Sequence, residues 1–198
     1  MEKLRVSVLV SGSGTNLQAI IDAVENGSLP NVKICQVISS SADAYALERA
    51  RNHEIPALAV TKSEFNDLRD RMDAILTHLE GEHTDLVVLA GYLSILPPKV
   101  IEEYKGRIIN IHPALLPKHG GKECYGLKVH RQVIADGEKE SGATVHFVDE
   151  GIDTGDIILQ EKVPVKPGDT PEVLRDRVLE VEHVILPKAI GMIEKGRH

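Results

Sequence analysis

The hydrophobic positions of this chain fall into short continuous runs separated by stretches of helical period. Runs rich in β-branched residues cover residues 4–10, 32–38, 86–90 and 107–111. Between them the apolar residues recur every three or four positions, which predicts helices at residues 16–26, 43–52, 64–80 and 98–104. Because continuous apolar strands are buried on both sides, this alternation predicts a mostly parallel sheet with helices on both faces.

Three residues mark the expected ends of these helices. Gly27 and Gly81 follow the last periodic positions of the first and third helices, where a glycine commonly stops a helix. Asp43 stands where a side chain would cap the start of the second helix.

The pattern changes after Gly126. A helix to Asp136 is followed by two runs at residues 142–149 and 156–165, which are joined through the turn-rich segment EGIDTG. This spacing predicts a hairpin or a mixed-sheet annex.

A long amphipathic helix is predicted near the end of the chain. It should begin after Thr170, with Pro171 at its first position, and run towards Gly191 with a bend at Pro187. No repeat or linker divides the chain, so we expect a single domain over residues 1–198. The sequence thus predicts an α/β fold with a mostly parallel sheet and a C-terminal mixed-sheet annex.

Composition narrows the choice of partners. The formal net charge is −7 and the basic residues are scattered among acids, which argues against nucleic acid or an anionic membrane as a partner. With four Tyr, two Phe and no Trp, base-stacking platforms are not expected. Cys35 and Cys124 are far apart, and the first apolar run is too short for a signal peptide or a membrane span. We therefore expect a protein of the reducing cytoplasm.

The turn after the first strand, in VLVSGSGTNLQAI, is a candidate phosphate site. A helix N-terminus exposes free N–H groups, and those of Gly14, Thr15 and Asn16 can hold one phosphomonoester. A dinucleotide fingerprint does not fit, because Leu17 occupies the third glycine position and serines follow the second strand. No Gly-Lys-Ser/Thr is present for a nucleoside triphosphate. A tight turn without a ligand is the structural alternative.

A second candidate site lies where the fourth aliphatic run ends. Asn110 and His112 share one face of the predicted strand, about 6.6 Å apart along the chain. Pro113 stops the strand directly after His112, at the edge where open α/β sheets bind their ligands. A hydrogen-bonded core histidine is the structural alternative here.

The loop DEGIDTGD offers a carboxylate that can orient this imidazole. Its acids are Asp149, Glu150, Asp153 and Asp156. Asp153 is the strongest candidate, because the glycines on either side of it let the backbone turn its side chain inward, and Asp149 and Asp156 are the alternatives. At ~4 Å and an effective dielectric of ~20 the pair would interact by about 4 kcal/mol, so we expect Asp153 to raise the pKa of His112. A solvated acidic turn is the alternative.

Together, Asn110, His112 and Asp153 predict acyl transfer without a covalent intermediate, with an amide and a protonated imidazole stabilising an oxyanion. No G-x-S-x-G segment is present, and neither cysteine neighbours a candidate base. The nine histidines form no H-E-x-x-H or H-x-x-E-H array, so no metal is expected.

Five segments resemble, in chain order, the phosphoribosylglycinamide formyltransferase family and cover the sequence to about Pro187. They are SGSGTNLQAIIDA, DLVVLAGYLSIL, GRIINIHPALLPKHGG, GATVHFVDEGIDTGDIILQEKVPV and EHVILP. The resemblance implies a single-domain Rossmann-like formyltransferase fold. It also implies transfer of a formyl group from 10-formyltetrahydrofolate to the amine of 5′-phosphoribosylglycinamide in purine biosynthesis. The expected partners are therefore small molecules, and a homodimer is left open.

The resemblance also implies roles for single residues. Asn110, His112 and Asp153 match the catalytic positions, Gly14, Thr15 and Asn16 match the phosphate seat, and Glu182 matches the group that holds the ribose. The walls of the folate slot are implied, with Asn110, by two segments, which consist of Leu93, Ser94, Ile95 and Leu96, and of Asp149, Glu150, Gly151, Ile152 and Asp153.

The sequence departs from the family pattern at two places. Many members carry Arg at the position of Ser94, and Arg69 is a candidate for the folate-binding arginine. The segment KHGGKECYGLKVHRQ is also longer, and we expect it to reshape the lip of the cleft while leaving the trio alone.

The nearest rival function is formyltetrahydrofolate hydrolase, which shares the Asn, His and Asp trio and delivers water to the formyl carbon. A hydrolase has no need of a phosphate seat. Methionyl-tRNA formyltransferase is disfavoured by the net acidity. A non-catalytic phosphosugar-binding module would have no use for the trio.

Overall fold

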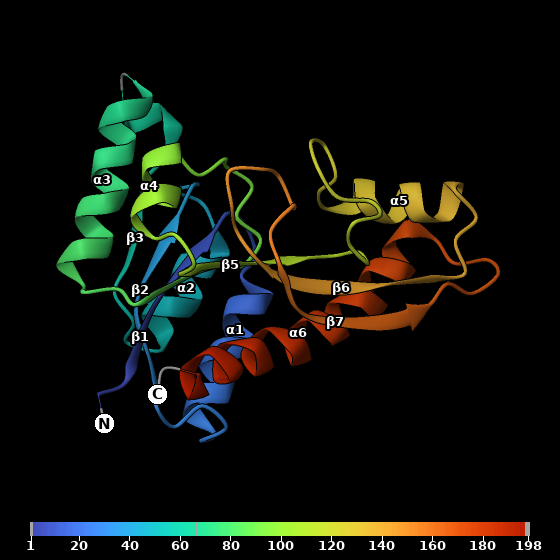
Figure 1. Cartoon of the computed structure of the whole chain (residues 1–198), viewed down its shortest axis with the longest axis horizontal. Coiled ribbons are helices and arrows are strands. Elements are labelled where there is room, and N and C mark those ends of the chain that lie inside the picture. The colour runs from blue at the N-terminus through green and yellow to red at the C-terminus, as the bar shows by residue number, and fades with distance from the viewer. Residues whose placement is uncertain (1, 66, 197–198) are drawn as a thin grey trace.

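One seven-stranded sheet organises the part of the chain that the computed structural model describes, residues 2–65 and 67–196 (Figure 1). Its strands are β1 (Leu4–Val10), β2 (Val32–Ser39), β3 (Ala57–Ala59), β4 (Leu86–Leu89), β5 (Ile108–His112), β6 (Glu140–Phe147) and β7 (Ile157–Pro164). They lie in the order β3-β2-β1-β4-β5-β6-β7. The pairs from β3 to β5 are parallel, and β6 and β7 are antiparallel to their neighbours. The predicted parallel sheet and its annex are confirmed.

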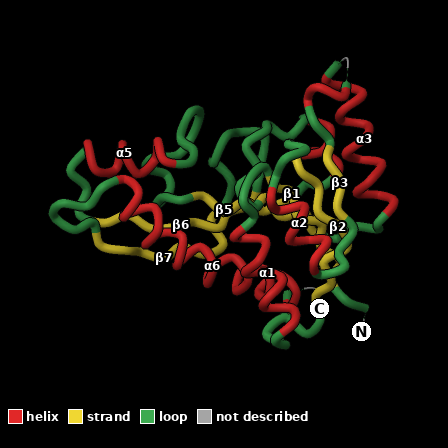
Figure 2. Tube along the Cα trace, turned by 180° about the vertical axis from the view of Figure 1, so that it is seen from behind, coloured by secondary structure: helices red, strands yellow, loops and turns green. Residues whose placement is uncertain are grey.

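Helices pack on both faces of the parallel part, and one further helix, α5, lies over the annex. The helices are α1 (Thr15–Glu25), α2 (Tyr45–Asn52), α3 (Leu68–Gly81), α4 (Pro98–Glu103), α5 (Leu127–Ala135) and α6 (Pro171–Lys195), with a 3₁₀ turn η1 (Lys62–Glu64) before α3. Val6, Val8 and Val10 of β1 pack in the core beneath α1 and α6, whereas Leu9 packs on the other face beneath α3 and α4. Figure 2 shows α3 beside the β3 edge and α5 over the annex, at opposite ends of the molecule.

The helix α6 connects the parallel sheet to the annex, because it packs against α1 as well as against β6 and β7. Its start is as predicted: the Thr170 side chain accepts from Val173 N at 3.3 Å, and Pro171 is the first helical residue. The predicted end at Gly191 is wrong, since the helix continues to Lys195. A Cβ at Gly191 would lie 3.1 Å from Leu29, so this glycine permits close packing on the α1–β2 loop.

The predicted helix at residues 64–80 is wrong at its N-terminal end. Glu64 belongs to η1, where its side chain accepts from Thr61 N in a capping box. A second cap starts α3, because the Asp67 carboxylate accepts from Arg69 N and from Asp70 N. These two local caps favour two short elements over one continuous helix.

Two predicted helix boundaries also differ. Asp43 does not cap α2; the N-cap is Ala44, and Ala46 N donates instead to the Gly12 carbonyl at 3.1 Å. Gly81 lies inside α3, and the left-handed residue after that helix is His83 with φ 48°. Gly27, by contrast, has φ 81° directly after α1, as expected. Among the described residues, no helix combines the length and hydropathy needed to cross a membrane.

Candidate active site

The side chains of Asn110, His112 and Asp153 meet where the sheet changes from parallel to antiparallel. Asn110 and His112 lie on β5, and Asp153 comes from the loop between β6 and β7, with φ 58°. The Asp153 carboxylate lies 3.5 Å from His112 Nδ1 and accepts from Asn110 Nδ2 at 3.4 Å. The structure therefore brings the three predicted residues together, although 43 positions separate Asn110 from Asp153.

The two ring nitrogens of His112 have different neighbours. Nε2 lies 2.8 Å from the His119 carbonyl, which can only accept, so Nε2 carries the proton. Nδ1 faces Asp153 at 3.5 Å, beyond an ordinary hydrogen bond. The imidazole is thus held in one orientation, with Nδ1 towards the carboxylate.

The predicted upward shift of the His112 pKa is wrong in its net direction. The side chain of His112 is buried, and burial lowers its pKa more than Asp153 and the His119 carbonyl raise it. The neighbouring imidazoles of His146 and His119 lower this pKa further. Without substrate, the imidazole is therefore neutral at neutral pH.

Asp153 stays ionised although it is half-buried. Burial alone would raise its pKa, but contact with His146, the nearby His112 and the Gly121 N–H together hold this pKa below its usual range. Gly121 N donates to Oδ2 at 3.0 Å. The site thus combines a carboxylate with a neutral imidazole.

His146 on β6 is a site residue that the sequence analysis missed. Its Nδ1 donates to the Phe147 carbonyl at 2.7 Å, and its Nε2 lies 3.2 Å from Asn110 Nδ2. The same Nε2 lies 3.4 Å from Asp153. His146 pairs in register with Asn110, so a polar residue in an otherwise apolar strand was the available signal.

The loop between β5 and α5 takes part in the trio, contrary to the expectation that it only reshapes the lip. The His119 carbonyl and the Gly121 N–H contact His112 and Asp153 directly. A Cβ at Gly120 would lie 2.5 Å from Leu116 Cδ2 and 3.3 Å from Asp153 Cβ. A side chain at position 120 would therefore require Leu116 and Asp153 to shift.

The glycine turn leaves the first N–H groups of α1 available. Gly14 has φ 72°, and α1 has no side-chain cap; its first backbone bond runs from Gln18 N to the Gly14 carbonyl at 2.9 Å. Arg49 of α2 adds a cation here, since its Nε donates to the Ser13 carbonyl at 2.8 Å. Arg49 was not among the site residues predicted from the sequence. This arrangement suits an anion at Gly14, Thr15 and Asn16.

Asn16 and Glu182 form a buried pair, with 7% and 8% of their surfaces exposed. Asn16 Nδ2 donates to Glu182 Oε2 at 2.6 Å. Burial raises the pKa of Glu182 to about 7, although the bond from Asn16 lowers it. Asn16 Oδ1 has no hydrogen-bond partner among the described residues. Glu182 therefore lies directly behind the first turn of α1.

A family model described as formyl transferase matches residues 4–190. This chain belongs to the formyl transferase family. It is 45% identical over 193 residues to the phosphoribosylglycinamide formyltransferase of Haemophilus influenzae, covering 98% of this chain and 88% of that relative. The Escherichia coli protein of the same name is 43% identical over 195 residues, with 98% and 89% covered.

The solved structures agree with this family. Glycinamide ribonucleotide transformylase 1 from Symbiobacterium toebii superimposes with a TM-score of 0.92 at 44% identity, covering 98% of this chain and 89% of that one. The comparisons confirm the predicted family, the Rossmann-like formyltransferase fold and formyl transfer as the chemistry of the enzyme.

The two segments expected to wall the folate slot follow β4 and β6 of the formyl transferase. Tyr92 and Val148, which flank them, pack against the same core cluster, and Figure 1 shows both loops on one side of the sheet. Leu93, Ile95 and Ile152 are exposed and can meet a flat ligand. Leu96 is instead buried in the core, so it supports the wall from behind.

Arg69 was predicted to supply the positive charge expected near this slot. Arg69 is exposed in the first turn of α3. The neighbouring Arg71 is buried, and its guanidinium donates to the Tyr92 hydroxyl at 3.0 Å and to the Val60 carbonyl at 3.2 Å. Arg71, which the sequence analysis did not single out, thus lies behind the segment that carries Ser94.

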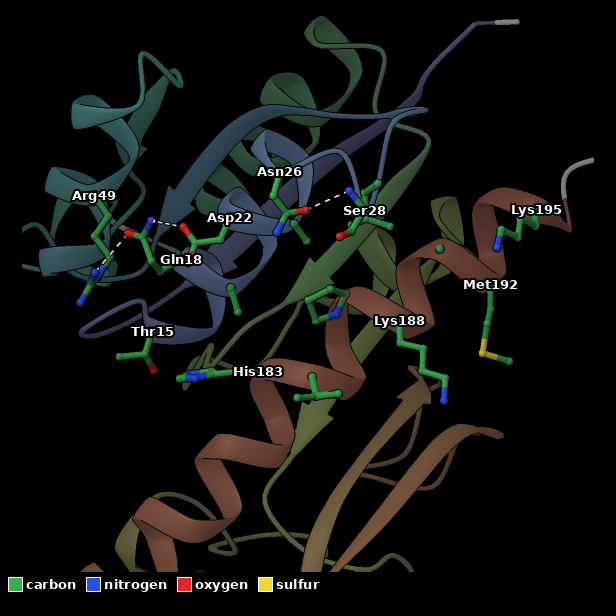
Figure 3. Close-up of a pocket in the computed structure, with 16 residues that line it drawn as sticks. Thr15, Gln18, Asp22, Asn26, Ser28, Arg49, His183, Lys188, Met192 and Lys195 are labelled. Carbon is green, nitrogen blue, oxygen red and sulfur yellow. Dashed lines mark hydrogen bonds between the residues drawn. The ribbon is translucent and has the colours of Figure 1, made fainter.

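A cavity of about 790 Å³ lies between α1 and α6 of the formyl transferase (Figure 3). Thr15 and His183 lie at the end near the glycine turn, and Met192 and Lys195 lie at the far end. Asn110, His112 and Asp153 do not line it. Within residues 2–65 and 67–196, no group of three or more His, Cys, Asp or Glu side chains is arranged to hold a metal ion.

Proposed function

We propose that this enzyme transfers the formyl group of 10-formyltetrahydrofolate to the amine of 5′-phosphoribosylglycinamide in purine biosynthesis, as one formyltransferase domain. The observation that carries the proposal is the convergence of Asn110, His112 and Asp153 at the carboxyl end of β5. Because β1, β4 and β5 are parallel, the glycine turn after β1, with its free N–H groups, lies at the same edge of the sheet. Relatives at 45% and 43% identity carry the corresponding name.

The acceptor, 5′-phosphoribosylglycinamide, is held at its phosphate and ribose, remote from its amine. The phosphate binds the N–H groups of Gly14, Thr15 and Asn16 and is attracted by Arg49, which reaches the turn from α2. Glu182 accepts from the ribose, since Asn16 occupies only its Oε2. This grip fixes the direction in which the amine points.

The formyl folate lies between the loop after β4 and the loop before β7. The exposed side chains of Leu93, Ile95 and Ile152 cover its flat ring, while the backbone of residues 149–153 meets its polar edge. Asn110, between the two loops, faces the formyl group. Two bound reactants aligned in this way can supply about 7–11 kcal/mol of the barrier.

In this mechanism Asn110 stabilises the developing negative charge, and His112 accepts the proton. When the amine attacks the formyl carbon, the carbonyl oxygen becomes an oxyanion that the Asn110 amide N–H stabilises. The amine nitrogen then loses a proton to His112 Nδ1, because Nε2 already holds a proton against the His119 carbonyl. The resulting imidazolium, paired with Asp153, adds its charge to the stabilisation of the oxyanion.

Collapse of the tetrahedral centre returns the proton. The C–O double bond forms again as the bond from carbon to the folate nitrogen breaks, and that nitrogen takes the proton from the imidazolium. The net change is one formyl group moved to the glycinamide and one proton moved to the folate. No atom of the enzyme becomes covalently bound.

The deciding experiment is an absorbance assay of folate deformylation with and without 5′-phosphoribosylglycinamide. We expect product only when the amine is present, and no product in either case with His112→Ala. Equal rates with and without the amine would reject the proposal in favour of formyltetrahydrofolate hydrolysis.

The same proposal includes a cytoplasmic location for the enzyme. Free Cys35 and Cys124 suit the cytoplasm, where thiols stay reduced. A homodimer remains a prediction, which light scattering on the purified protein can test.

A further inference from the structure

His119 lies beside the trio with a backbone conformation that is uncommon for its residue type. Its φ is 55°, in the left-handed region, and its carbonyl accepts the Nε2 proton of His112 at 2.8 Å. Two residues later, Gly121 N donates to Asp153 at 3.0 Å. The segment 119–121 therefore contacts both His112 and Asp153 through its backbone.

The imidazole of His119 points away from the trio and lies between two carboxylates. Nδ1 is 3.7 Å from Asp136 Oδ2, and Nε2 is 3.7 Å from Glu138 Oε1. The His119 side chain is 9% exposed, whereas the side chains of Asp136 and Glu138 are 52% and 27% exposed. Both acids belong to the turn between α5 and β6, and we call them the acidic clamp.

A further contact holds the acidic clamp in place. Lys118 Nζ donates to Glu138 Oε1 at 2.8 Å, which lowers the pKa of Glu138 and keeps this acid ionised. Nε2 of His119 makes no hydrogen bond among the described residues and lies 3.7 Å from Glu138 Oε1. The turn after α5 is thereby tied to the loop that touches His112.

A left-handed residue other than glycine persists only where its surroundings hold it. Here the neighbours in sequence, Gly120 and Gly121, impose little conformation of their own, and Gly121 has φ 96°. The buried imidazole between two acids is the feature that can fix this backbone. We propose that His119 is a positioning residue: clamped by Asp136 and Glu138, it holds its carbonyl against His112 Nε2 and so directs His112 Nδ1 towards Asp153 and the reacting atoms.

This inference rests on the proposed function, because it makes His119 responsible for the His112 tautomer that the proposed reaction needs. With the carbonyl in place, the neutral ring carries its proton on Nε2 and offers a lone pair at Nδ1. If the His119 carbonyl moves, the proton of the neutral His112 ring distributes over Nδ1 and Nε2. In part of the enzyme population Nδ1 then carries the proton and offers no lone pair. A residue that served stability alone would leave this tautomer unchanged.

The test compares two ways of releasing the backbone. His119→Ala removes the imidazole, whereas the double variant Asp136→Asn, Glu138→Gln keeps His119 and removes the charges around it. If His119→Ala does not fold, the double variant still tests the idea. His53→Ala is the matched control, since His53 also contacts a carboxylate, that of Glu25 at 2.7 Å, far from the trio in sequence and on other elements.

Two readouts are required: steady-state kinetics and ¹⁵N NMR of the His112 ring at a pH where it is neutral. We expect kcat to fall about 10- to 100-fold in both clamp variants with little change in KM, together with a mixture of His112 tautomers. His53→Ala should match the parent enzyme in both.

The outcomes separate the two proposals. An unchanged kcat or an unchanged His112 tautomer in the clamp variants overturns the positioning role. His112→Ala is measured in parallel: if that variant keeps its activity, the proposed function itself fails, whatever His119 does. If His112→Ala is inactive and the clamp variants are normal, only the role of His119 is lost.

Discussion

At the scale of single residues, the site depends on which neighbour each polar atom has. His112 and Asp153 lie 3.5 Å apart, yet burial lowers the pKa of the imidazole while the surrounding donors lower that of the carboxylate. The resting site therefore contains one negative charge and one neutral base. Because Nε2 is engaged by a carbonyl, Nδ1 is the ring nitrogen that can accept a proton in the proposed mechanism.

Substitution of Asp153 by Asn tests the carboxylate. An amide preserves the shape but removes the charge that stabilises the imidazolium, so we expect kcat to fall about 100-fold or more while KM changes little. Asp156→Asn, in the same acidic loop but exposed, is the control and should keep normal turnover. Near-normal turnover in Asp153→Asn would remove Asp153 from the mechanism.

The titration of His112 is a second test at this scale. Since burial lowers its pKa, NMR titration of the substrate-free enzyme should give a midpoint below the ordinary value of 6.5. Asp153 acts in the opposite direction and raises this pKa, so the midpoint in Asp153→Asn should lie lower still. A midpoint above 6.5 in the parent enzyme would contradict the structure.

At the scale of elements, the turn before α1 packs closely against α2. Gly14 has φ 72°, and a Cβ there would lie 2.6 Å from Ala46 Cβ. Gly12, two residues earlier, would meet nothing within 4 Å. The two glycines of the turn thus have unequal structural roles, and only Gly14 is demanded by packing.

This difference makes a matched pair of variants. Gly14→Ala combines left-handed strain with steric overlap, and we expect it to lower the free energy of unfolding by about 2–4 kcal/mol. It should also raise KM for the phosphorylated acceptor more than KM for the folate, because the N–H groups move. Gly12→Ala should change both quantities little. Urea unfolding and steady-state kinetics measure the two effects, and equal behaviour of the two variants would count against the packing argument.

The same scale shows what the sequence could and could not predict. β1 was predicted residue for residue, and the trio was found because strand period and a glycine-flanked loop are local signals. His146, Arg49 and Arg71 were missed because their roles depend on strand register and helix packing. The start of α3 was wrong because two side-chain caps divided a stretch of uniform helical period.

At the scale of the whole molecule, two buried ionisable groups act on stability in opposite directions. His130 on α5 is 1% exposed, and burial lowers its pKa to about 4, with Arg175 adding to the shift. Glu182 on α6 is raised to a pKa of about 7. Acid therefore disfavours the folded state through His130, and base disfavours it through Glu182.

The contribution of His130 is lost as pH falls. Its pKa is lower in the folded than in the unfolded chain, so the unfolded chain binds more protons between about pH 6.5 and about pH 4. The full shift corresponds to about 3 kcal/mol. His130→Gln should flatten this part of the curve of unfolding free energy against pH, whereas His78→Gln, exposed on α3, should not. Identical slopes in His130→Gln and the parent would refute the assignment.

Glu182 gives the opposite slope. Its pKa is raised on folding, so the cost of ionising it grows between about pH 4.5 and about pH 7 and is complete above that. Glu182→Gln should therefore be more stable than the parent at pH 8, by up to about 3 kcal/mol, and show no gain at pH 4. Glu180→Gln, exposed on the same helix, is the control. Chemical denaturation at pH 4 and pH 8 measures the free energy of unfolding of the parent and of both variants.

The path of α6 has a consequence for engineering. Because this helix packs on α1, β6 and β7, and also carries Glu182 to Asn16, the antiparallel strands are not an independent module. A chimera that takes β6, β7 and their loop from another member of the family would inherit a surface fitted to a different α6. Recombination between such enzymes should therefore transfer α5, β6, β7 and α6 as one block and take α1, with Asn16, from the same parent.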